Sequence, residues 1–166
     1  GDYNGEDLPY NLEWKNSGGP MGGIGYDIRI NPENEDIMYV TDANAGAFKS
    51  TDGGKTWFTI NKGLNVTFGP SSDNVPVFCL TIDPHNPETI WCGMQDQKGL
   101  FKSSNGGETW RRMDNGIEGD QGITFRGITV HPHDPDIVYA AGEVSSFVWS
   151  GEPQNGVMFD KTKGIV

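Results

Sequence analysis

The sequence is poor in basic residues, and it lacks both a long apolar run and sustained helical periodicity. Lys and Arg number 12 against 23 Asp and Glu, which gives a formal net charge of −11. Nucleic acids and anionic membrane surfaces need a basic face on the protein, so we expect neither as a partner. No apolar stretch approaches the roughly 18 residues of a membrane-spanning helix, so no membrane insertion is expected. No segment shows the i, i+3, i+4, i+7 apolar spacing of an amphipathic helix.

Turn-forming residues are abundant instead. The chain has 24 Gly and 10 Pro among its 166 residues. Most of them cluster between short runs of β-branched and aromatic residues, as an alternation of strands and turns requires. The composition therefore predicts an all-β protein.

One segment of the chain is repeated. Residues 50–57 (STDGGKTW) recur as residues 103–110 (SSNGGETW), 53 positions later. The segment upstream of each copy is also repeated, as INPENEDIMYV at 30–40 and IDPHNPETIWC at 82–92, and a third version, VHPHDPDIVYA, follows at 130–140. A period near 50 residues built from short strands is typical of a β-propeller, in which each repeat is one four-stranded antiparallel blade.

Aligning the repeats predicts where each strand lies. Strands are expected at 25–30, 37–41, 46–50 and 56–60 in one blade (25–60), and at 77–82, 89–93, 99–103 and 109–113 in the next (76–113). An incomplete blade (124–166) has strands at 127–130 and 137–141 and the start of another at 163–166, and 12–17 is the outer strand of a closing blade. Residues 1–166 thus form a partial β-propeller of about two full blades plus partial ones. Because proteins avoid long unpaired sheet edges, the remainder of the propeller is an expected partner, from the same protein or a companion chain.

The repeated motif supplies the turn between the third and fourth strands of each blade. Asp or Asn can hydrogen-bond the turn backbone, Gly can adopt positive φ, and Trp can pack beneath the turn. The motif resembles the Asp-box, the bacterial-neuraminidase repeat with the pattern Ser-x-Asp-x-Gly-x-Thr-Trp. Its residues are Ser50, Asp52, Gly54, Thr56 and Trp57 in the first copy and Ser103, Asn105, Gly107, Thr109 and Trp110 in the second. Since Asn105 replaces the acid, we assign both copies a structural role and expect both Trp side chains to be largely buried.

The longer loops are expected at the opposite end of the blades. The Asn-Pro and Asp-Pro turns at 31–36, 83–88 and 131–136 lie beside the Asp-boxes, whereas the irregular connections gather at the other end, where function usually resides. Amides and aromatic rings in these loops suit sugars, which stack on rings and accept paired hydrogen bonds. We predict substrate-binding residues Asn44, Gln95, Asp96, Phe147 and Trp149. Alternatively, Trp149 packs onto a neighbouring blade.

The first 65 residues resemble the opening of the tandem-propeller glycoside hydrolases that cleave xyloglucan and related β-glucans. The resemblance rests on Trp14-Lys15-Asn16, Gly22-Gly23-Ile24, Ile30-Asn31-Pro32, Met38-Tyr39-Val40-Thr41-Asp42 and Ala45-Gly46-Ala47-Phe48-Lys49. It implies that Asp42 is one of two catalytic carboxylates, the other lying in a second propeller. Val40 stands where the family has Arg, and Asn44-Ala45-Gly46 replaces Gly-Gly.

The resemblance implies part of a secreted, carbohydrate-active glycoside hydrolase with a polysaccharide as partner, located outside the cell or at its surface. This chain alone is expected to be inactive, because glycoside hydrolysis needs two carboxylates. The alternative is a non-catalytic propeller for carbohydrate or protein binding, as in the more distantly similar sortilin-like receptors, or for assembly or surface structure. No cofactor is expected. The pair His131 and His133 has no third metal ligand nearby in sequence, so no metal site is predicted.

Cys79 and Cys92 are the two cysteines of the chain. They are equidistant from the turn centred at residues 85–86, so regular antiparallel pairing places them opposite each other and favours a disulfide. Two buried free thiols are the alternative.

Overall fold

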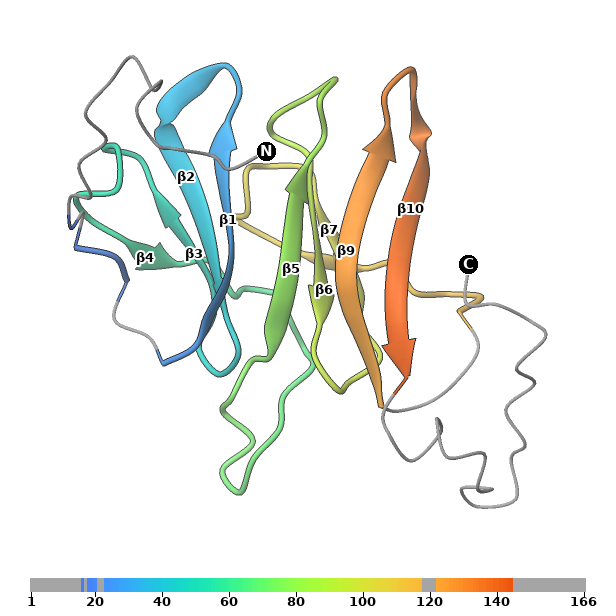
Figure 1. Cartoon of the computed structure of the whole chain (residues 1–166). Coiled ribbons are helices and arrows are strands. Elements are labelled where there is room, and N and C mark those ends of the chain that lie inside the picture. The colour runs from blue at the N-terminus through green and yellow to red at the C-terminus, as the bar shows by residue number, and fades with distance from the viewer. Residues whose placement is uncertain (1–15, 17, 21–22, 118–121, 145–166) are drawn as a thin grey trace, which may run out of the picture.

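The structure, a computed structural model, describes residues 16, 18–20, 23–117 and 122–144, which form three antiparallel sheets (Figure 1). The first has β1 (Gly25–Asn31), β2 (Asn34–Asp42), β3 (Gly46–Ser50) and β4 (Phe58–Thr59). The second has β5 (Val77–Ile82), β6 (Ile90–Met94), β7 (Leu100–Ser103) and β8 (Arg111–Arg112). The third is a hairpin of β9 (Ile123–His131) and β10 (Asp134–Val144). The all-β fold with four-stranded antiparallel sheets is confirmed.

The sheets stand side by side like the blades of a propeller. Strand order follows chain order in both four-stranded sheets. The first strands of the three sheets, β1, β5 and β9, are neighbours and contact one another in series (Figure 1). Short turns join β1 to β2, β5 to β6 and β9 to β10 at the upper end in Figure 1, and the longer connection between β4 and β5 lies at the lower end.

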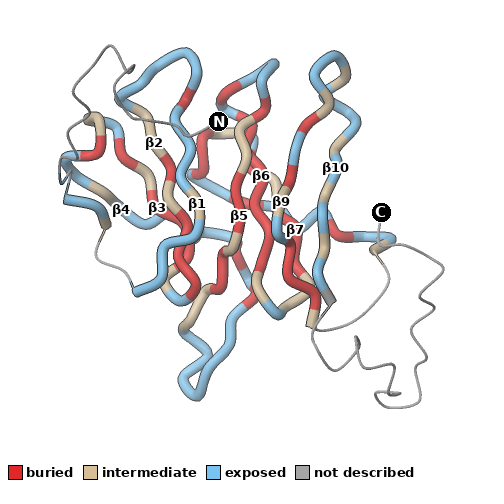
Figure 2. Tube along the Cα trace, viewed as in Figure 1, coloured by how far each residue is buried: buried red, intermediate tan, exposed pale blue. Residues whose placement is uncertain are grey.

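Two hydrophobic clusters fill the spaces between successive sheets, and the red segments of Figure 2 follow the strands that enclose them. The first cluster joins side chains of the first two sheets, including Tyr39, Leu80 and Phe101. The second joins the other face of the middle sheet to the hairpin, including Trp91 and Phe125. The middle sheet is therefore covered on both faces, which is why β6 is buried along its whole length.

The outer faces of the first sheet and the hairpin carry exposed apolar side chains. Ile28 and Ile30 of β1 are 58% and 53% exposed, and Tyr139 of β10 is 53% exposed. Alternate residues of a strand point to the same side, so Ile28 and Ile30 form one apolar row. These faces are where further blades of a propeller would pack.

The predicted strand positions agree with the structure to within a few residues, and the differences have local causes. The fourth strands are shorter than predicted, because Thr56 still belongs to the Asp-box turn, where its N–H donates to Asp52 (2.9 Å). Strand β9 begins before its predicted start at Gly127, since Thr124 and Phe125 pair with β10 beyond a register shift at Ala141 and Gly142. The expected strands at 12–17 and 163–166 lie outside the described residues, apart from Asn16, which is not in a strand.

The cysteine pairing favoured from the sequence is wrong. The register aligns Cys79 with Gly93 and Leu80 with Cys92, one residue away from regular pairing about the turn centre. Cys79 and Cys92 therefore point to opposite faces of the sheet, and each belongs to a different hydrophobic cluster. Both are buried free thiols.

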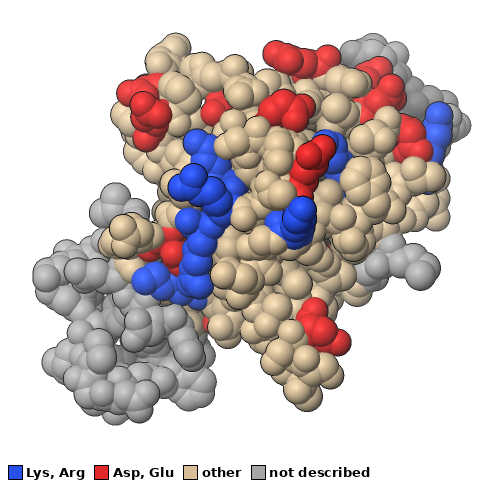
Figure 3. All heavy atoms as spheres, turned by 180° about the vertical axis from the view of Figure 1, so that it is seen from behind, with Lys and Arg blue, Asp and Glu red and all other residues tan. Residues whose placement is uncertain are grey.

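The two ends of the sheets differ in character. Where the short turns lie, each Asp-box turn hydrogen-bonds to the chain at or just before the start of the second strand of the same sheet, through Gly53 N–H to Asp36 O and Gly106 N–H to Glu88 O. Seen from behind, most acidic side chains lie toward this end, and the largest group of Lys and Arg side chains runs down one side of the face (Figure 3). Among the described residues no helix is long and apolar enough to span a membrane.

Candidate functional site

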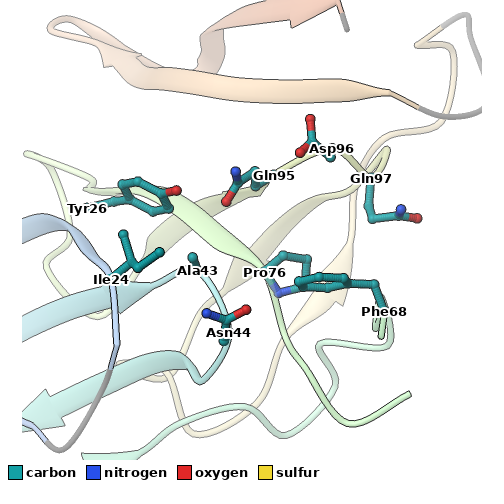
Figure 4. A pocket seen from close by; sticks show the side chains of 9 residues that line it. All are labelled: Ile24, Tyr26, Ala43, Asn44, Phe68, Pro76, Gln95, Asp96 and Gln97. Carbon is teal, nitrogen blue, oxygen red and sulfur yellow. The ribbon is translucent and has the colours of Figure 1, made fainter. Parts of the chain in front are cut away.

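A pocket of about 200 Å³ lies at the end of the sheets opposite the Asp-boxes (Figure 4). It is formed where β1 begins, where β2 and β6 end, and where the connection between β4 and β5 passes. Its lining residues are Ile24, Tyr26, Ala43, Asn44, Phe68, Pro76, Gln95, Asp96 and Gln97. Three of the five predicted substrate-binding residues, Asn44, Gln95 and Asp96, are thus brought together from two different sheets.

Backbone hydrogen bonds tie the pocket walls to one another. Asn44 O accepts from Val75 N–H (2.9 Å), and Pro76 O accepts from Gln95 N–H (2.8 Å). Ala43 N–H donates to Ile24 O (3.0 Å). The loops after β2 and β6 are therefore joined through the segment that leads into β5, which fixes the pocket side chains relative to one another.

Two aromatic rings stand at the sides of the pocket. Tyr26 stacks on Phe78 of β5, with ring centroids 4.2 Å apart and an interplanar angle of 27°. Phe68 is 38% exposed, and Figure 4 shows its ring beside that of Pro76. The amides of Asn44 and Gln95 lie between these rings in Figure 4. This combination of apolar faces and convergent polar groups is typical of small-ligand sites.

Asp42, the predicted catalytic residue, is buried beside the pocket and does not line it. It is 3% exposed. Its Oδ1 accepts hydrogen bonds from the N–H groups of Asn44 (2.8 Å) and Ala45 (2.9 Å), and its Oδ2 accepts from Ile24 N–H (2.9 Å). Both Ile24 and Asn44 are pocket residues, so the Asp42 carboxylate fixes the backbone on two sides of the pocket. Its catalytic role stays a prediction.

Asp96 joins the second sheet to the hairpin. Its N–H donates to Thr124 Oγ1 (2.9 Å), and the Thr124 hydroxyl donates to Asp96 Oδ1 (3.2 Å). Its φ is +51°, in the left-handed region that Asp tolerates better than most residues. The strained backbone and the Thr124 contact set the direction of this carboxylate at the rim of the pocket.

The remaining predicted binding residues, Phe147 and Trp149, lie outside the described residues. Sequence reasoning also missed Tyr26, which comes from a strand and not from a loop. The register of β1 on β2 shifts between Gly25 and Asp27, at the position of Tyr26. An irregular strand pairing leaves no clear sign in the sequence, so neither this shift nor the position of the Tyr26 ring could be read from it.

The Asp-box side chains lie in turns at the other end of the sheets. Asp52 Oδ1 accepts from Thr56 N–H (2.9 Å), and Asp52 Oδ2 accepts from the Thr56 hydroxyl (2.6 Å). These bonds lower the pKa of Asp52 to about 2, because they favour the ionised form. Asn105 Oδ1 likewise accepts from Thr109 N–H (3.0 Å). Gly54 and Gly107, at φ +82° and +89°, donate their N–H groups to Ser50 Oγ and Ser103 Oγ, 2.9 Å each.

The two Asp-box tryptophans differ in burial, contrary to expectation. Trp110 is 5% exposed and donates from Nε1 to Ile60 O of the preceding sheet (2.6 Å). Trp57 is half-buried and donates to Gly54 O within its own turn (3.0 Å). Trp110 is covered because the first sheet lies beside it.

The histidines of the short turns lie together without forming a metal site in the described part of the chain. His85 Nε2 is 3.3 Å from His131 O, and the rings of His131 and His133 are 6.0 Å apart. No group of three or more His, Cys, Asp or Glu side chains among the described residues is arranged to bind a metal.

Comparison with known proteins gives partial similarities to xyloglucanases. The chain is 27% identical over 183 residues to the xyloglucanase Xgh74A of Acetivibrio thermocellus, covering 93% of this chain and 20% of that protein. It is 30% identical over 91 residues to a probable oligoxyloglucan-reducing end-specific xyloglucanase of Neosartorya fischeri, covering 54% of this chain and 10% of that protein. The chain thus spans a fifth or less of these curated relatives. No family model matches it.

The fold is similar to part of a solved enzyme. The crystal structure of an ancestral GH74 enzyme superimposes with a TM-score of 0.55 at 22% identity, covering 80% of this chain and 15% of that one. The sheets described above therefore match part of a GH74 propeller. In sequence and in fold the chain is partially similar to the GH74 xyloglucanases, which are tandem-propeller glycoside hydrolases.

Proposed function

We propose that this chain is part of a secreted, carbohydrate-active β-propeller protein, a glycoside hydrolase acting on a β-glucan-type polysaccharide outside the cell or at its surface. The observation that carries the proposal is the similarity to a xyloglucanase along 93% of the chain. The chain spans only a fifth of that relative, so the activity belongs to the larger protein, and the remainder of the propeller is its first partner.

The pocket offers the chemistry that a glucan chain requires. The exposed ring of Phe68 can stack on the C–H face of a glucosyl unit, as aromatic rings do with apolar surfaces. The amides of Asn44 and Gln95 can each donate and accept, and the Asp96 carboxylate can accept from hydroxyl groups. The pocket would hold one part of the polysaccharide, while the rest extends over surfaces outside the described residues.

Asp42 is our candidate for one of the two carboxylates that hydrolysis needs. The acid and base of an inverting enzyme lie ~6.5–9.5 Å apart, on opposite sides of the scissile bond. Asp42 follows β2 at the end of the sheet that carries the pocket, and a second carboxylate would come from elsewhere in the larger protein. This chain alone is expected to bind glucan without cleaving it.

A non-catalytic binding propeller is the second candidate. The hydrogen bonds of Asp42 favour it: its two carboxylate oxygens accept three backbone N–H groups, a complete structural role that needs no substrate. In this alternative Asp42 only shapes the pocket.

Binding is tested on the full chain by calorimetry with xyloglucan oligosaccharides and mixed-linkage glucan. Phe68→Ala and Gln95→Ala should each weaken binding about fivefold or more, since a lost stacking or paired polar contact is worth ~1 kcal/mol or more. Phe58→Ala is the matched control, because Phe58 is an exposed phenylalanine on β4 that does not line the pocket. Equal affinity for all three variants would contradict the site.

Catalysis is tested in the longer protein that contains this chain, with Asp42→Asn and Asp42→Ala. If Asp42 is catalytic, both variants lose hydrolysis by at least about 100-fold while oligosaccharide binding persists. If it only shapes the pocket, Asp42→Asn keeps most of the turnover, since the amide oxygen still accepts from Asn44 and Ala45 and only the Ile24 N–H loses its acceptor. That second result would leave the protein a hydrolase whose catalytic carboxylates lie elsewhere, whereas no hydrolysis by the wild-type longer protein would favour the binding propeller.

A further inference from the structure

The junction between the first and second sheets contains a specific polar contact. Tyr39 of β2 and Lys49 of β3 are register partners, and the Lys49 ammonium lies 5.5 Å from the centroid of the Tyr39 ring. Both donate to the carbonyl of Gly106, in the Asp-box turn of the second sheet, at 2.9 Å from Lys49 Nζ and 3.4 Å from the Tyr39 hydroxyl. Two strands of one sheet thus hold the turn of the next.

The second sheet has an equivalent pair of hydrogen-bond donors. Trp91 of β6 and Lys102 of β7 are register partners, and the Lys102 ammonium lies 5.2 Å from the Trp91 ring. Trp91 and Lys102 occupy the same places in their sheet as Tyr39 and Lys49 do in theirs. In the first sheet Tyr39 pairs with Arg29, and at the equivalent place in the second sheet Trp91 pairs with Thr81. The same aromatic–lysine pair therefore faces the hairpin β9–β10.

No carbonyl among the described residues accepts a hydrogen bond from the Trp91 indole. Trp91 is 7% exposed, and its Nε1 is a buried donor with no hydrogen-bond partner within the described part of the chain. Leaving such a donor unsatisfied costs free energy, so native proteins nearly always supply an acceptor. The third sheet has only its first two strands among the described residues, so it contributes no Asp-box turn there. The sequence after Val144 contains no Gly-Gly-x-Thr-Trp segment either.

We propose that Trp91 Nε1 and Lys102 Nζ bind the backbone carbonyl of an Asp-box hairpin that completes the third sheet along β10. The occupant is a strand–turn–strand segment with the pattern Ser-x-Asp/Asn-Gly-Gly-x-Thr-Trp, from the remainder of the propeller. Its carbonyl accepts two hydrogen bonds, one from the indole and one from the ammonium group, as the Gly106 carbonyl does at the first junction.

Glycine is favoured at the residue that carries this carbonyl. Gly106 has φ +60°, and a Cβ there would lie 2.8 Å from Lys49 Nζ and 2.7 Å from Glu88 Oε2. A side chain would thus displace the ammonium group that binds the carbonyl. The Trp91–Lys102 pair therefore selects a turn with Gly at this position.

The test uses the full 166-residue chain, uniformly labelled with ¹⁵N, and an unlabelled synthetic peptide of residues 99–113, which contains one complete strand–turn–strand hairpin. The Trp91 indole N–H resonance is identified by its absence in Trp91→Phe. On titration this resonance should move downfield, because the indole gains an acceptor. Chain variants Trp91→Phe and Lys102→Met should each bind the peptide at least threefold more weakly, with the other indole resonances unchanged as a check on folding.

The matched control is the same peptide with Gly106→Ala, which should bind at least tenfold more weakly. Three results would each overturn the proposal: no binding at millimolar peptide, binding that leaves the Trp91 resonance unmoved, or equal affinity for the wild-type chain and both variants. Chemical-shift changes confined to residues of β1 would show that the peptide occupies the opposite outer face, which also contradicts it.

Discussion

The side chains at the two Asp-box positions differ by one charge, yet both form the same turn. Asp52 and Asn105 each accept from the serine hydroxyl two residues earlier at 2.8 Å, and from the backbone N–H four residues later. Only the contact with the threonine hydroxyl reverses direction, since Asn105 Nδ2 donates to Thr109 Oγ1. At this position the turn requires a hydrogen-bonding side chain and not a charge.

Asp52→Asn should therefore lower stability only slightly at pH 7. The pKa of Asp52 is about 2 in the folded chain, below its ordinary value near 3.9. Its ionisation thus contributes stability that is present above about pH 4 and lost as the pH falls toward 2. Urea unfolding at pH 7, 4 and 2.5 measures the free energy of unfolding of both proteins. The difference between wild type and Asp52→Asn should become smaller as the pH falls. A difference that grows on acidification would contradict this assignment.

The two Asp-box tryptophans should differ in their energetic contribution. Trp110→Ala removes a buried aromatic ring and the donor to Ile60, so it should cost ~3–5 kcal/mol of unfolding free energy. Trp57→Ala should cost clearly less in this chain, because Trp57 is half-buried. Chemical unfolding followed by circular dichroism measures both. Equal losses would mean that Trp57 is covered as completely as Trp110.

At the scale of the elements, the repeat and the approximate positions of the strands could be predicted from the sequence. The register of one strand on the next could not. The repeated motif located β3, β7 and the Asp-box turns because Gly, Asp and Trp have fixed roles there. The placement of Cys79 and Cys92 failed, because a shift of one residue at the turn of residues 85–86 reverses which face each side chain meets. The pocket followed the same pattern: Asn44, Gln95 and Asp96 could be predicted from loop position, whereas Tyr26 depended on a local shift in pairing.

Gly93 shows how closely the elements pack at the centre. A Cβ at this position would lie 2.4 Å from Phe125 Cβ and 3.1 Å from Cys79 Sγ. Gly93→Ala should therefore push β9 away from β6 and cost ~1–3 kcal/mol, the usual range for overpacking. Gly127→Ala is the control, because nothing lies within 4 Å of the added carbon. Thermal unfolding of both variants measures the loss. If Gly93→Ala leaves the stability unchanged, the two sheets can move apart at no cost in free energy.

On the scale of the whole molecule, each described sheet makes its main contacts with the sheet beside it, and the middle sheet has a thiol on each of its two faces. Architectures of this kind derive their stability from each unit and from the interfaces between adjacent units. Cys79 reports on the interface with the hairpin, and Cys92 reports on the interface with the first sheet.

Both thiols should react only when the interfaces open. Burial raises the pKa of Cys79 to about 12 and the pKa of Cys92 well above its usual value. These raised pKa values contribute stability that is complete below about pH 8.5, the unfolded value, and is lost as the pH rises toward 12. Labelling by a thiol reagent at pH 7–8 should follow the rate of opening, and mild oxidant should produce no Cys79–Cys92 disulfide. Immediate labelling of either residue in the folded chain would contradict the burial.

The contact of Tyr39 and Lys49 with Gly106 also follows the order in which the chain is synthesised. The donors come from the earlier repeat and the acceptor from the later one, so during synthesis the donors of each blade leave the ribosome before the carbonyl that they bind. Each new blade can then dock onto a neighbour that is already formed, and the carbonyl of its Asp-box turn accepts the hydrogen bonds from that neighbour. A deletion that removes the Asp-box turn of one repeat should therefore loosen the docking of that repeat onto the one made before it.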